Sequence, residues 1–344
     1  MQFRKTKIAA VAHVLPEEEI TSADIEDRLS PLYERLGLPK GRLELMTGIH
    51  SRRTWPPNTR PSDASAMAGR AVLQKLPDLG EVDILIHAAV SRDRLEPATA
   101  AYVHKALNLP RHTQIFDLSN ACLGFLNAMV VAGGMIESGL IRKALIVSGE
   151  NGGPLLEKTI STLLEGDFTR KSVKPFFANL TIGSGAVGMV LCHRDVLPET
   201  GLADLEFGVC GTDGRFSHLC EGDSSSNGGL VMQTDSEALL EAGIGLAADT
   251  WTEFQKKDQE KREFSRIITH QVGKTHQRRL HEALSIDPSK DFPSYPFLGN
   301  VGSVSCPITL SISEEEAPSP KKARIALLGI GSGLSSVMLA IRKY

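Results

Sequence analysis

The amino-acid sequence predicts an α/β fold, and three observations point to this class. Apolar segments of strand length alternate with helical segments, as at residues 82–90, 113–118 and 143–148. These segments are almost continuously apolar, which is typical of strands covered on both faces and favours largely parallel sheets. A Gly-Ser-Gly turn that leads into a strand also occurs twice, at residues 183–185 and 331–333.

The repeated turn indicates how the chain is divided. Each copy closes a series of α/β units, so we predict two similar halves, residues 1–192 and 193–344. Residues from about 151 to 179 interrupt the alternation of strands and helices. They contain an amphipathic helix and then a basic, aromatic loop, and we interpret them as an insertion or a cap.

The remaining elements follow from the same patterns in chain order. Ser22 is expected to cap a helical segment over residues 22–36, which Pro31 interrupts. Further strands are expected at residues 7–14, 186–191, 266–271, 324–328 and 337–341, and further helices at residues 63–76, 121–138, 155–164 and 274–284.

Composition narrows the class of protein. The chain has 344 residues, with 41% hydrophobic and 23% charged residues, which is ordinary for a globular protein. Its net charge of -3 argues against a nucleic-acid partner, which would normally select a basic surface. Five cysteines without close pairs indicate a reducing compartment. Because no signal peptide or transmembrane segment is evident, we expect a cytoplasmic protein.

A candidate nucleophile lies between the strand expected at residues 113–118 and the helix that follows it. Ser119 or Asn120 is expected to cap that helix, which places Cys122 in its first turn. Unpaired backbone N–H groups and the helix dipole at this position would stabilise a thiolate able to attack a carbonyl carbon. The alternative is a buried structural cysteine, since free cysteines are among the most buried residues.

A candidate histidine lies in the second half, at the tip of a short apolar strand. His270 ends this strand, where functional groups of open α/β sheets usually lie, although a structural histidine is the commoner case. His276 and His281 follow on the next helix. No metal site is expected, because the spacing does not pair His270 with His276 on one helix and no carboxylate-rich partner lies nearby.

Two glycine-rich segments complete the candidate site. Asn300 is bracketed by glycines and can present its amide at a loop tip, although Asn and Gly are also ordinary turn residues. Residues 329–333 follow a strand and so resemble a dinucleotide-binding turn. That motif needs a following helix and a later acidic residue, which the sequence lacks. A turn that presents backbone N–H groups to an oxyanion fits better.

Together these motifs resemble the thiolase superfamily, specifically the branch that contains β-ketoacyl-acyl-carrier-protein synthase III. The resemblance covers nearly the whole chain and implies duplicated βαβαβαββ halves in a five-layer αβαβα sandwich, normally a homodimer. The matching motifs, in family order, are Thr47-Gly48-Ile49, Asn120-Ala121-Cys122, His270-Gln271, Gly299-Asn300-Val301-Gly302-Ser303 and the C-terminal Gly-Ser-Gly turn.

Within this branch the chain looks most like the OleA-type enzymes, which join two fatty-acyl thioesters head to head. The distinguishing segment is residues 90–100, because synthase III lacks a carboxylate at the position of Glu96. The chain also departs from synthase III before the Thr-Gly-Ile motif. Met46 occupies the place of an arginine that holds coenzyme A there, which implies a different hold on the adenine end.

The resemblance implies an acyltransferase mechanism that needs coenzyme A thioesters as substrates and no cofactor. Cys122 would carry the acyl group, and the backbone N–H groups of Cys122 and Ser332 would form the oxyanion hole. His270 and Asn300 would stabilise the enolate of the second acyl-CoA. Glu96 would remove its α-proton, provided that burial raises the pKa of this carboxylate. The product would be a β-keto acid.

Two other hypotheses remain open. In the first, the chain is a synthase III enzyme that condenses an acyl-CoA with malonyl-acyl-carrier protein, a decarboxylation that needs no base. In the second, it is a scaffold subunit that keeps only the fold. If the chain is a synthase III enzyme, Glu96 would be a surface acid. Arg52 and Arg53 are either contacts to coenzyme A phosphates or solvated arginines. An acyl carrier protein and the downstream enzymes of hydrocarbon synthesis are the partners to consider.

Overall fold

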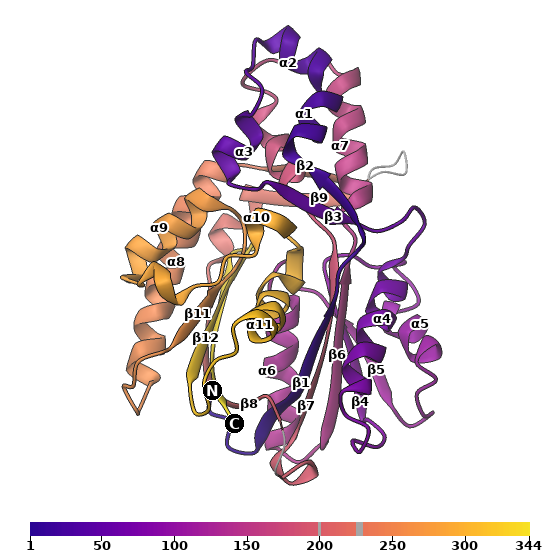
Figure 1. Cartoon of the computed structure of the whole chain (residues 1–344), viewed down its shortest axis with the longest axis vertical. Coiled ribbons are helices and arrows are strands. Elements are labelled where there is room, and N and C mark those ends of the chain that lie inside the picture. The colour runs from indigo at the N-terminus through magenta and orange to yellow at the C-terminus, as the bar shows by residue number, and fades with distance from the viewer. Residues whose placement is uncertain (199–200, 225–229) are drawn as a thin grey trace.

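The computed structural model describes residues 1–198, 201–224 and 230–344 and shows two sets of strands separated by helices (Figure 1). The first set contains five strands in the order β1-β7-β6-β4-β5, and the second contains four in the order β11-β12-β13-β8. Their bounds are β1 Thr6–Val14, β4 Ile84–Ala88, β5 Gln114–Leu118, β6 Lys143–Glu150, β7 Gly185–His193, β8 Ala203–Thr212, β11 Arg266–Thr269, β12 Arg324–Gly331 and β13 Ser335–Lys343.

The helices form the other three layers of a five-layer αβαβα arrangement, as the resemblance implied (Figure 1). Two helices lie between the sets of strands, and two cover each outer face. The central helices are α6 Gly124–Glu137 and α11 Ser305–Glu316; the outer ones are α4 Pro61–Gln74 and α5 Thr99–Ala106 on one face, and α8 Ser236–Lys257 and α9 Lys274–Leu284 on the other.

The expectation of largely parallel sheets is wrong for part of the fold. Strand β4 pairs in parallel with β5 and β6, and β11 pairs in parallel with β12. The strands that follow the two Gly-Ser-Gly turns, β7 and β13, instead pair antiparallel with both of their neighbours. A short connection such as that between β12 and β13 reverses the chain, whereas a parallel pair needs a crossover. Two residue pairs between β1 and β8 join the sets into one nine-stranded sheet.

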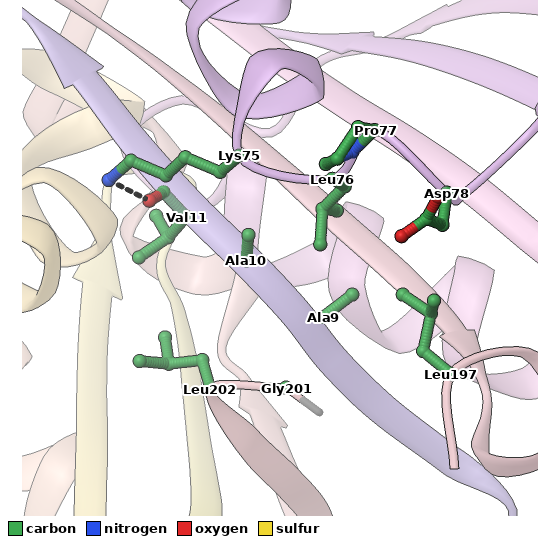
Figure 2. Close-up of a pocket in the computed structure, with 10 residues that line it drawn as sticks. All are labelled: Ala9, Ala10, Val11, Lys75, Leu76, Pro77, Asp78, Leu197, Gly201 and Leu202. Carbon is green, nitrogen blue, oxygen red and sulfur yellow. Dashed lines mark hydrogen bonds between the residues drawn. The ribbon is translucent and has the colours of Figure 1, made fainter. Parts of the chain in front are cut away.

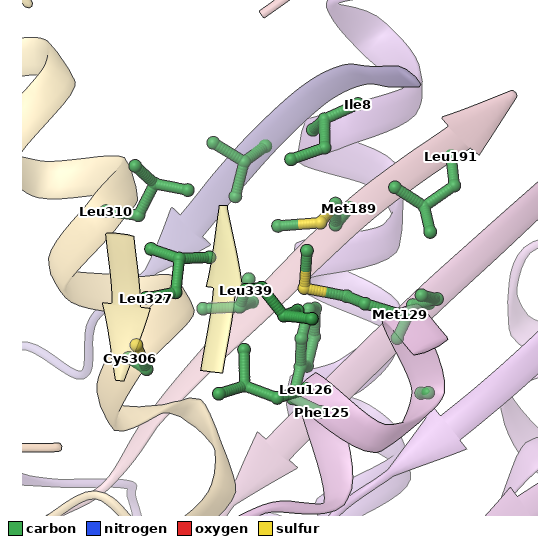
Figure 3. Packing of buried hydrophobic residues seen from close by; sticks show 14 of the residues in the cluster. Ile8, Phe125, Leu126, Met129, Met189, Leu191, Cys306, Leu310, Leu327 and Leu339 are labelled. Carbon is green, nitrogen blue, oxygen red and sulfur yellow. The ribbon is translucent and has the colours of Figure 1, made fainter. Parts of the chain in front are cut away.

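The central helices are buried by apolar residues from both halves of the chain (Figure 3). Phe125, Leu126 and Met129 of α6 belong to one core cluster with Leu310 of α11. Strand residues of both sets contribute to the same cluster. Because burial of apolar surface is the main stabilising term, this shared core fixes the two halves against each other.

A cap lies at the end of the sandwich to which α6 points with its N-terminus (Figure 1). Predicted segments 22–36 and 151–179 meet here, since Ile25 and Leu32 pack in one cluster with Leu156 and Ile160. Thr21, and not Ser22 as expected, caps the first helix of this region. The cap contains α1 Ser22–Arg28, α2 Ser30–Leu36, α3 Arg42–Thr47, α7 Gly153–Glu165, β2 Glu18–Thr21, β3 Ser51–Thr54, β9 Cys220–Ser224, β10 Leu230–Thr234 and the 3-10 helix Lys174–Thr181.

Short elements connect the larger ones. They are α10 Tyr295–Leu298 and the 3-10 helices Arg194–Val196, Gly214–Leu219, Pro288–Lys290 and Gly302–Val304. Across the described ranges, none of the helices is both long enough and apolar enough to cross a bilayer.

Candidate active site

Cys122 lies in a tight turn directly before the central helix α6. The helix begins at Gly124 with Leu123 at its N-cap, so the prediction that Cys122 occupies the first helical turn is wrong by about two residues. The Leu123 N–H donates to the Asn120 carbonyl at 2.9 Å and closes the turn. Ala121 has a φ of 46°, a left-handed conformation that an alanine adopts only when its surroundings enforce it. Such strain is common where a side chain must be aimed at a substrate.

The expected stabilisation of a Cys122 thiolate is not present in the free protein. Burial of the thiol raises the pKa of Cys122 to about 12, and the negative charge of Glu150 acts in the same direction. Ser119 and Asn120 do not cap α6; the Asn120 amide instead donates to the Asn127 side chain at 2.8 Å. Cys122 is therefore a neutral thiol before a substrate arrives.

His270 follows the last residue of β11 and is buried, with 5% of its surface exposed. Its backbone N–H donates to the Leu328 carbonyl of β12 at 2.9 Å. Burial lowers the pKa of His270 to about 3, and the neighbouring His276 adds to the effect. Burial also lowers the pKa of His276 to about 4. Both imidazoles are neutral near pH 7, so His270 can donate a hydrogen bond without carrying charge.

The Asn300 amide is oriented by its own loop. Its Oδ1 accepts from the Gly302 N–H at 3.1 Å and lies 3.5 Å from the Ser305 hydroxyl. Since the oxygen is used inside the loop, the Nδ2 group is the part left to face a ligand. The backbone is fixed as well, because the Asn300 N–H donates to the Thr181 carbonyl at 2.9 Å. The predicted presentation of an amide N–H₂ at a loop tip fits this geometry.

Contacts between the two halves of the chain link these residues. His270 bonds to Leu328 of β12, the strand that ends at Gly331. Ser303 in the Asn300 loop bonds to Glu150, whose charge acts on Cys122. Leu123, Ile268 and Val301, which lie within two positions of Cys122, His270 and Asn300, belong to the same buried cluster. The C-terminal glycine turn also reaches the nucleophile. A Cβ placed on Gly331 would lie 3.1 Å from the Leu123 side chain and 3.5 Å from the Cys122 backbone nitrogen, so this turn packs directly against the backbone of the nucleophile. Ser332 follows it and is half-buried.

Glu96 does not have the environment that its proposed role requires. It is exposed in a loop between β4 and α5, beside Leu95, which is 91% exposed. The expected burial of this carboxylate is therefore absent in the single chain. The stem of the loop is nevertheless well anchored, because Asp93 accepts from the Ser62 N–H at 2.9 Å and from the Ser62 hydroxyl at 2.5 Å.

The two candidate arginines are not placed for a phosphate in solvent. Arg52 is 1% exposed, and its Nε and Nη2 atoms have no hydrogen-bond partner in the described chain. Burial lowers the pKa of Arg52 to about 10. Arg53 is partly exposed, donates to the Glu17 carbonyl at 3.0 Å and pairs with Glu19 at 3.3 Å. A phosphate would have to displace these partners of Arg53.

Sequence reasoning missed Glu150, the last residue of β6. Its carboxylate is 4% exposed and accepts hydrogen bonds from the backbone of Val90, Ser91 and Ser303. It also influences the pKa of Cys122. The signal in the sequence is a carboxylate at the end of an otherwise apolar strand, a place where functional groups of α/β sheets occur.

Two cavities in the described part of the chain lie away from the predicted site residues. One of about 390 Å³ lies over β1 and the end of α4, where Lys75 donates to the Val11 carbonyl at 3.0 Å (Figure 2). Another of about 640 Å³ is lined by residues of α8 and α9, including Trp251.

Two models of one protein family match the chain. The family model described as 3-oxoacyl-[acyl-carrier-protein] synthase III matches residues 116–167, and the model of its C-terminal part matches residues 254–343. These ranges include Cys122, His270, Asn300 and Ser332. They do not include Glu96.

Curated relatives match over the full length of the chain. The acyl-CoA:acyl-CoA alkyltransferase of Xanthomonas campestris is 36% identical over 99% of both chains. The protein of the same name from Shewanella oneidensis is 34% identical over 99% of this chain and all of its own. A crystal structure of Xanthomonas campestris OleA with bound lauric acid and lauroyl-CoA superposes with a TM-score of 0.92, at 35% identity and 99% coverage of both chains.

Proposed function

Because this chain belongs to the acyl-CoA:acyl-CoA alkyltransferase (OleA) group within the synthase III branch of the thiolase superfamily, we propose that it joins two fatty acyl-CoAs without decarboxylation. The full-length match at 34–36% identity carries this proposal. It favours an OleA-type acyltransferase over both a decarboxylating synthase III and a scaffold. The reaction is a Claisen condensation that gives a β-keto acid after thioester hydrolysis.

The first half-reaction transfers an acyl group to Cys122. The thiol attacks the thioester carbonyl, and coenzyme A leaves with the proton. Because the thiol and His270 are both neutral in the free protein, the thiolate forms only as the substrate is attacked. The carbonyl oxygen then becomes negative, and the backbone N–H groups of Cys122 and Ser332 are proposed to receive it. The close contact between the Gly331 turn and the Cys122 backbone supports this arrangement.

The second half-reaction creates a carbon nucleophile on another acyl-CoA. Removal of its α-proton places negative charge on the thioester oxygen. His270 and Asn300 are proposed to donate hydrogen bonds to that oxygen, one from a neutral imidazole and one from the amide Nδ2. The enolate carbon attacks the acyl group on Cys122, the C–C bond forms, and the thiolate leaves.

Glu96 is the proposed base for this proton transfer. Variants of Xanthomonas campestris OleA have been solved in which a glutamate or a cysteine is replaced, and that glutamate precedes that cysteine by the same number of residues that separates Glu96 from Cys122. The exposure of Glu96 means that something outside this single chain must bury its carboxylate. A second copy of the chain is the proposed cover.

The surface around Glu96 supports a homodimer. Strand β5 is one of the two edge strands of the nine-stranded sheet, and Ile115 on it is 37% exposed. Val90 and Leu95 in the neighbouring loop are 47% and 91% exposed. An open strand edge with exposed apolar residues is a surface that proteins normally cover. Light scattering of wild type and L95D tests this: wild type should be a dimer and L95D a monomer.

Incubation with lauroyl-CoA alone tests the proposed reaction. Wild type should release coenzyme A and form a β-keto acid or the ketone derived from it. Turnover that appears only after malonyl-acyl-carrier protein is added would instead assign the synthase III reaction, which the family model and the exposure of Glu96 make the second candidate. Mixed dimers of E96Q and C122A subunits then show which active site Glu96 serves. Activity returns on mixing only if the carboxylate acts on the partner's site.

A further inference from the structure

Glu150 receives four hydrogen bonds from two loops that belong to different halves of the chain. Oε1 accepts from the Val90 N–H at 2.8 Å and Oε2 from the Ser91 N–H at 3.0 Å. Oε1 also accepts from the Ser303 N–H at 3.0 Å and from the Ser303 hydroxyl at 2.7 Å. These four donors compensate for burying a carboxylate with 4% exposure.

Each of these loops carries a residue of the proposed reaction. Val90 and Ser91 form the stem of the loop that presents Glu96. Ser303 follows Gly302, whose N–H holds the Oδ1 atom of Asn300. A shift of the Ser303 backbone is therefore transmitted to the Asn300 amide within two residues.

We propose that Glu150 is a positioning residue that holds the Glu96 loop and the Asn300 loop in register for the condensation step. The inference rests on the proposed function, because it assigns both loops to the second half-reaction. The carboxylate of Glu150 is occupied by donors from these two loops. It acts by fixing where the base and the enolate donor stand relative to each other.

The packing around Glu150 shows that its position is tightly defined. A Cβ on Gly302 would lie 2.9 Å from Oε1, so the glycine loop closes directly over the carboxylate. The Trp55 indole donates to the Glu150 carbonyl at 3.0 Å and holds the backbone. Replacement of Glu150 by glutamine keeps the size of the side chain but turns one acceptor into an N–H₂ donor. That donor would face a backbone N–H of Val90, Ser91 or Ser303, and at least one loop must move.

The test separates acylation of Cys122 from condensation. In E150Q, the initial burst of coenzyme A release from lauroyl-CoA should stay within about threefold of wild type. Formation of the β-keto acid should fall about a hundredfold, the loss typical of a reacting group displaced by about 1 Å. If E150Q does not fold, S303A provides the second variant, because it keeps the Ser303 N–H and removes the hydroxyl, which contacts Glu150, the Ala88 carbonyl and Ser148. S303A should lower condensation severalfold and leave the burst unchanged.

A matched control comes from Glu26 in the cap. This buried carboxylate also accepts two backbone N–H groups, from Gly41 and Leu43, and a hydroxyl, from Tyr33. E26Q and E150Q should both lower thermal stability. E26Q should keep the burst of coenzyme A release and the rate of condensation near wild type.

Three outcomes would overturn the inference. They are wild-type condensation in E150Q or S303A, an equal loss of burst and condensation in E150Q, and a loss in E26Q that matches the loss in E150Q. A wild-type protein that makes no product from lauroyl-CoA alone refutes the proposed function instead. The condensation rate of E150Q relative to wild type is then measured with malonyl-acyl-carrier protein as the second substrate. Asn300 would still stabilise the enolate in that reaction.

Discussion

Two Gly-Ser-Gly turns stand at equivalent places in the two halves, each before an antiparallel strand, yet their surroundings differ. In the first, Ser184 is fully buried; its N–H donates to the Arg53 carbonyl at 2.9 Å, and its hydroxyl accepts from the Gly152 N–H at 3.0 Å. In the second, Ser332 is half-buried and Gly333 is exposed. The Ser184 N–H and hydroxyl of the first turn are therefore occupied by hydrogen bonds within the protein. The second turn remains partly accessible beside Cys122.

The difference shows how a duplicated fold can assign one copy to structure and the other to chemistry. The first turn supports the site indirectly, since the Gly183 N–H donates to the Asn300 carbonyl at 2.9 Å. The second turn approaches Cys122 itself. The backbone differs as well: Gly185 is already the first residue of β7, whereas Gly333 has a φ of 118° in the hairpin turn between β12 and β13. The same four-residue pattern, Ile-Gly-Ser-Gly, therefore predicts that a strand follows but not which copy meets the substrate.

The largest expected effect comes from removing the thiol of Cys122, which lies beside the second turn. C122A should abolish coenzyme A release from lauroyl-CoA, a loss of at least about 10⁴-fold, because no acyl-enzyme can form. The melting temperature should change little, since one sulfur atom is lost from a half-buried position. Measurable turnover in C122A would mean that the reaction does not depend on Cys122. The second turn would then have no catalytic role to distinguish it from the first.

The glycines of the two turns should respond to the same substitution in opposite ways. A Cβ on Gly183 would lie 2.0 Å from the Leu298 carbonyl oxygen, so G183A should cost about 3 kcal/mol of folding stability. A Cβ on Gly331 would lie 3.1 Å from the side chain of Leu123, which must shift, and Leu123 is the residue that follows Cys122. G331A should therefore lower the acylation rate about a hundredfold while costing about 1 kcal/mol. Denaturant midpoints and burst kinetics check the pair, and equal effects on stability would count against the distinction.

The serines offer a gentler form of the same comparison. S184A leaves the buried Gly152 N–H without its acceptor, which should cost about 1–3 kcal/mol of folding stability. S332A keeps the backbone N–H that is proposed to bind the oxyanion, so its turnover should stay within about twofold of wild type and its stability within about 0.5 kcal/mol. A large loss of turnover in S332A would mean that its hydroxyl, and not only its backbone, acts in the reaction.

Folding stability should fall in acid because of two buried histidines, His270 and His276. The folded protein keeps His270 and His276 neutral, whereas the unfolded chain protonates them below the ordinary histidine pKa of 6.5. Their contribution to stability is therefore complete above pH 6.5 and is lost as the pH falls. At pH 5.5 the loss should be about 1 kcal/mol for each histidine. Urea midpoints at pH 7.5 and 5.5 measure it, and H276N should show about half of the difference.

Local patterns in the sequence predicted much of the fold. Continuous apolar runs located β4 and β6 to within two or three residues, and the helix α9 has the predicted bounds of residues 274–284. The family motifs singled out Cys122, His270 and Asn300; sequence neighbours of all three belong to one core cluster, and the roles of the three residues stay predictions. These successes depend on short-range periodicity and on motifs that extend over a few residues.

Features that depend on distant parts of the chain were not predicted. Arg52 looked like a surface residue and is buried, because residues near Gly183 and Gly299 pack against its Cβ. Glu96 was expected to be buried, but burial requires a surface that the single chain does not contain. Glu150 drew no attention because its partners lie about 60 and 153 positions away in the sequence. Sequence spacing carries no information on such contacts.

The first strand of the chain occupies the middle of the nine-stranded sheet, and this has a consequence for the order of assembly. Strand β1 pairs with β7 and with β8, so none of its ladder can form before residues 185–204 have been synthesised. Closing so long a stretch of chain carries a large entropic cost, and such non-local pairing slows folding. During translation, the apolar residues of β1 must therefore remain without their strand partners while more than half of the polypeptide is made, a period in which aggregation competes with folding.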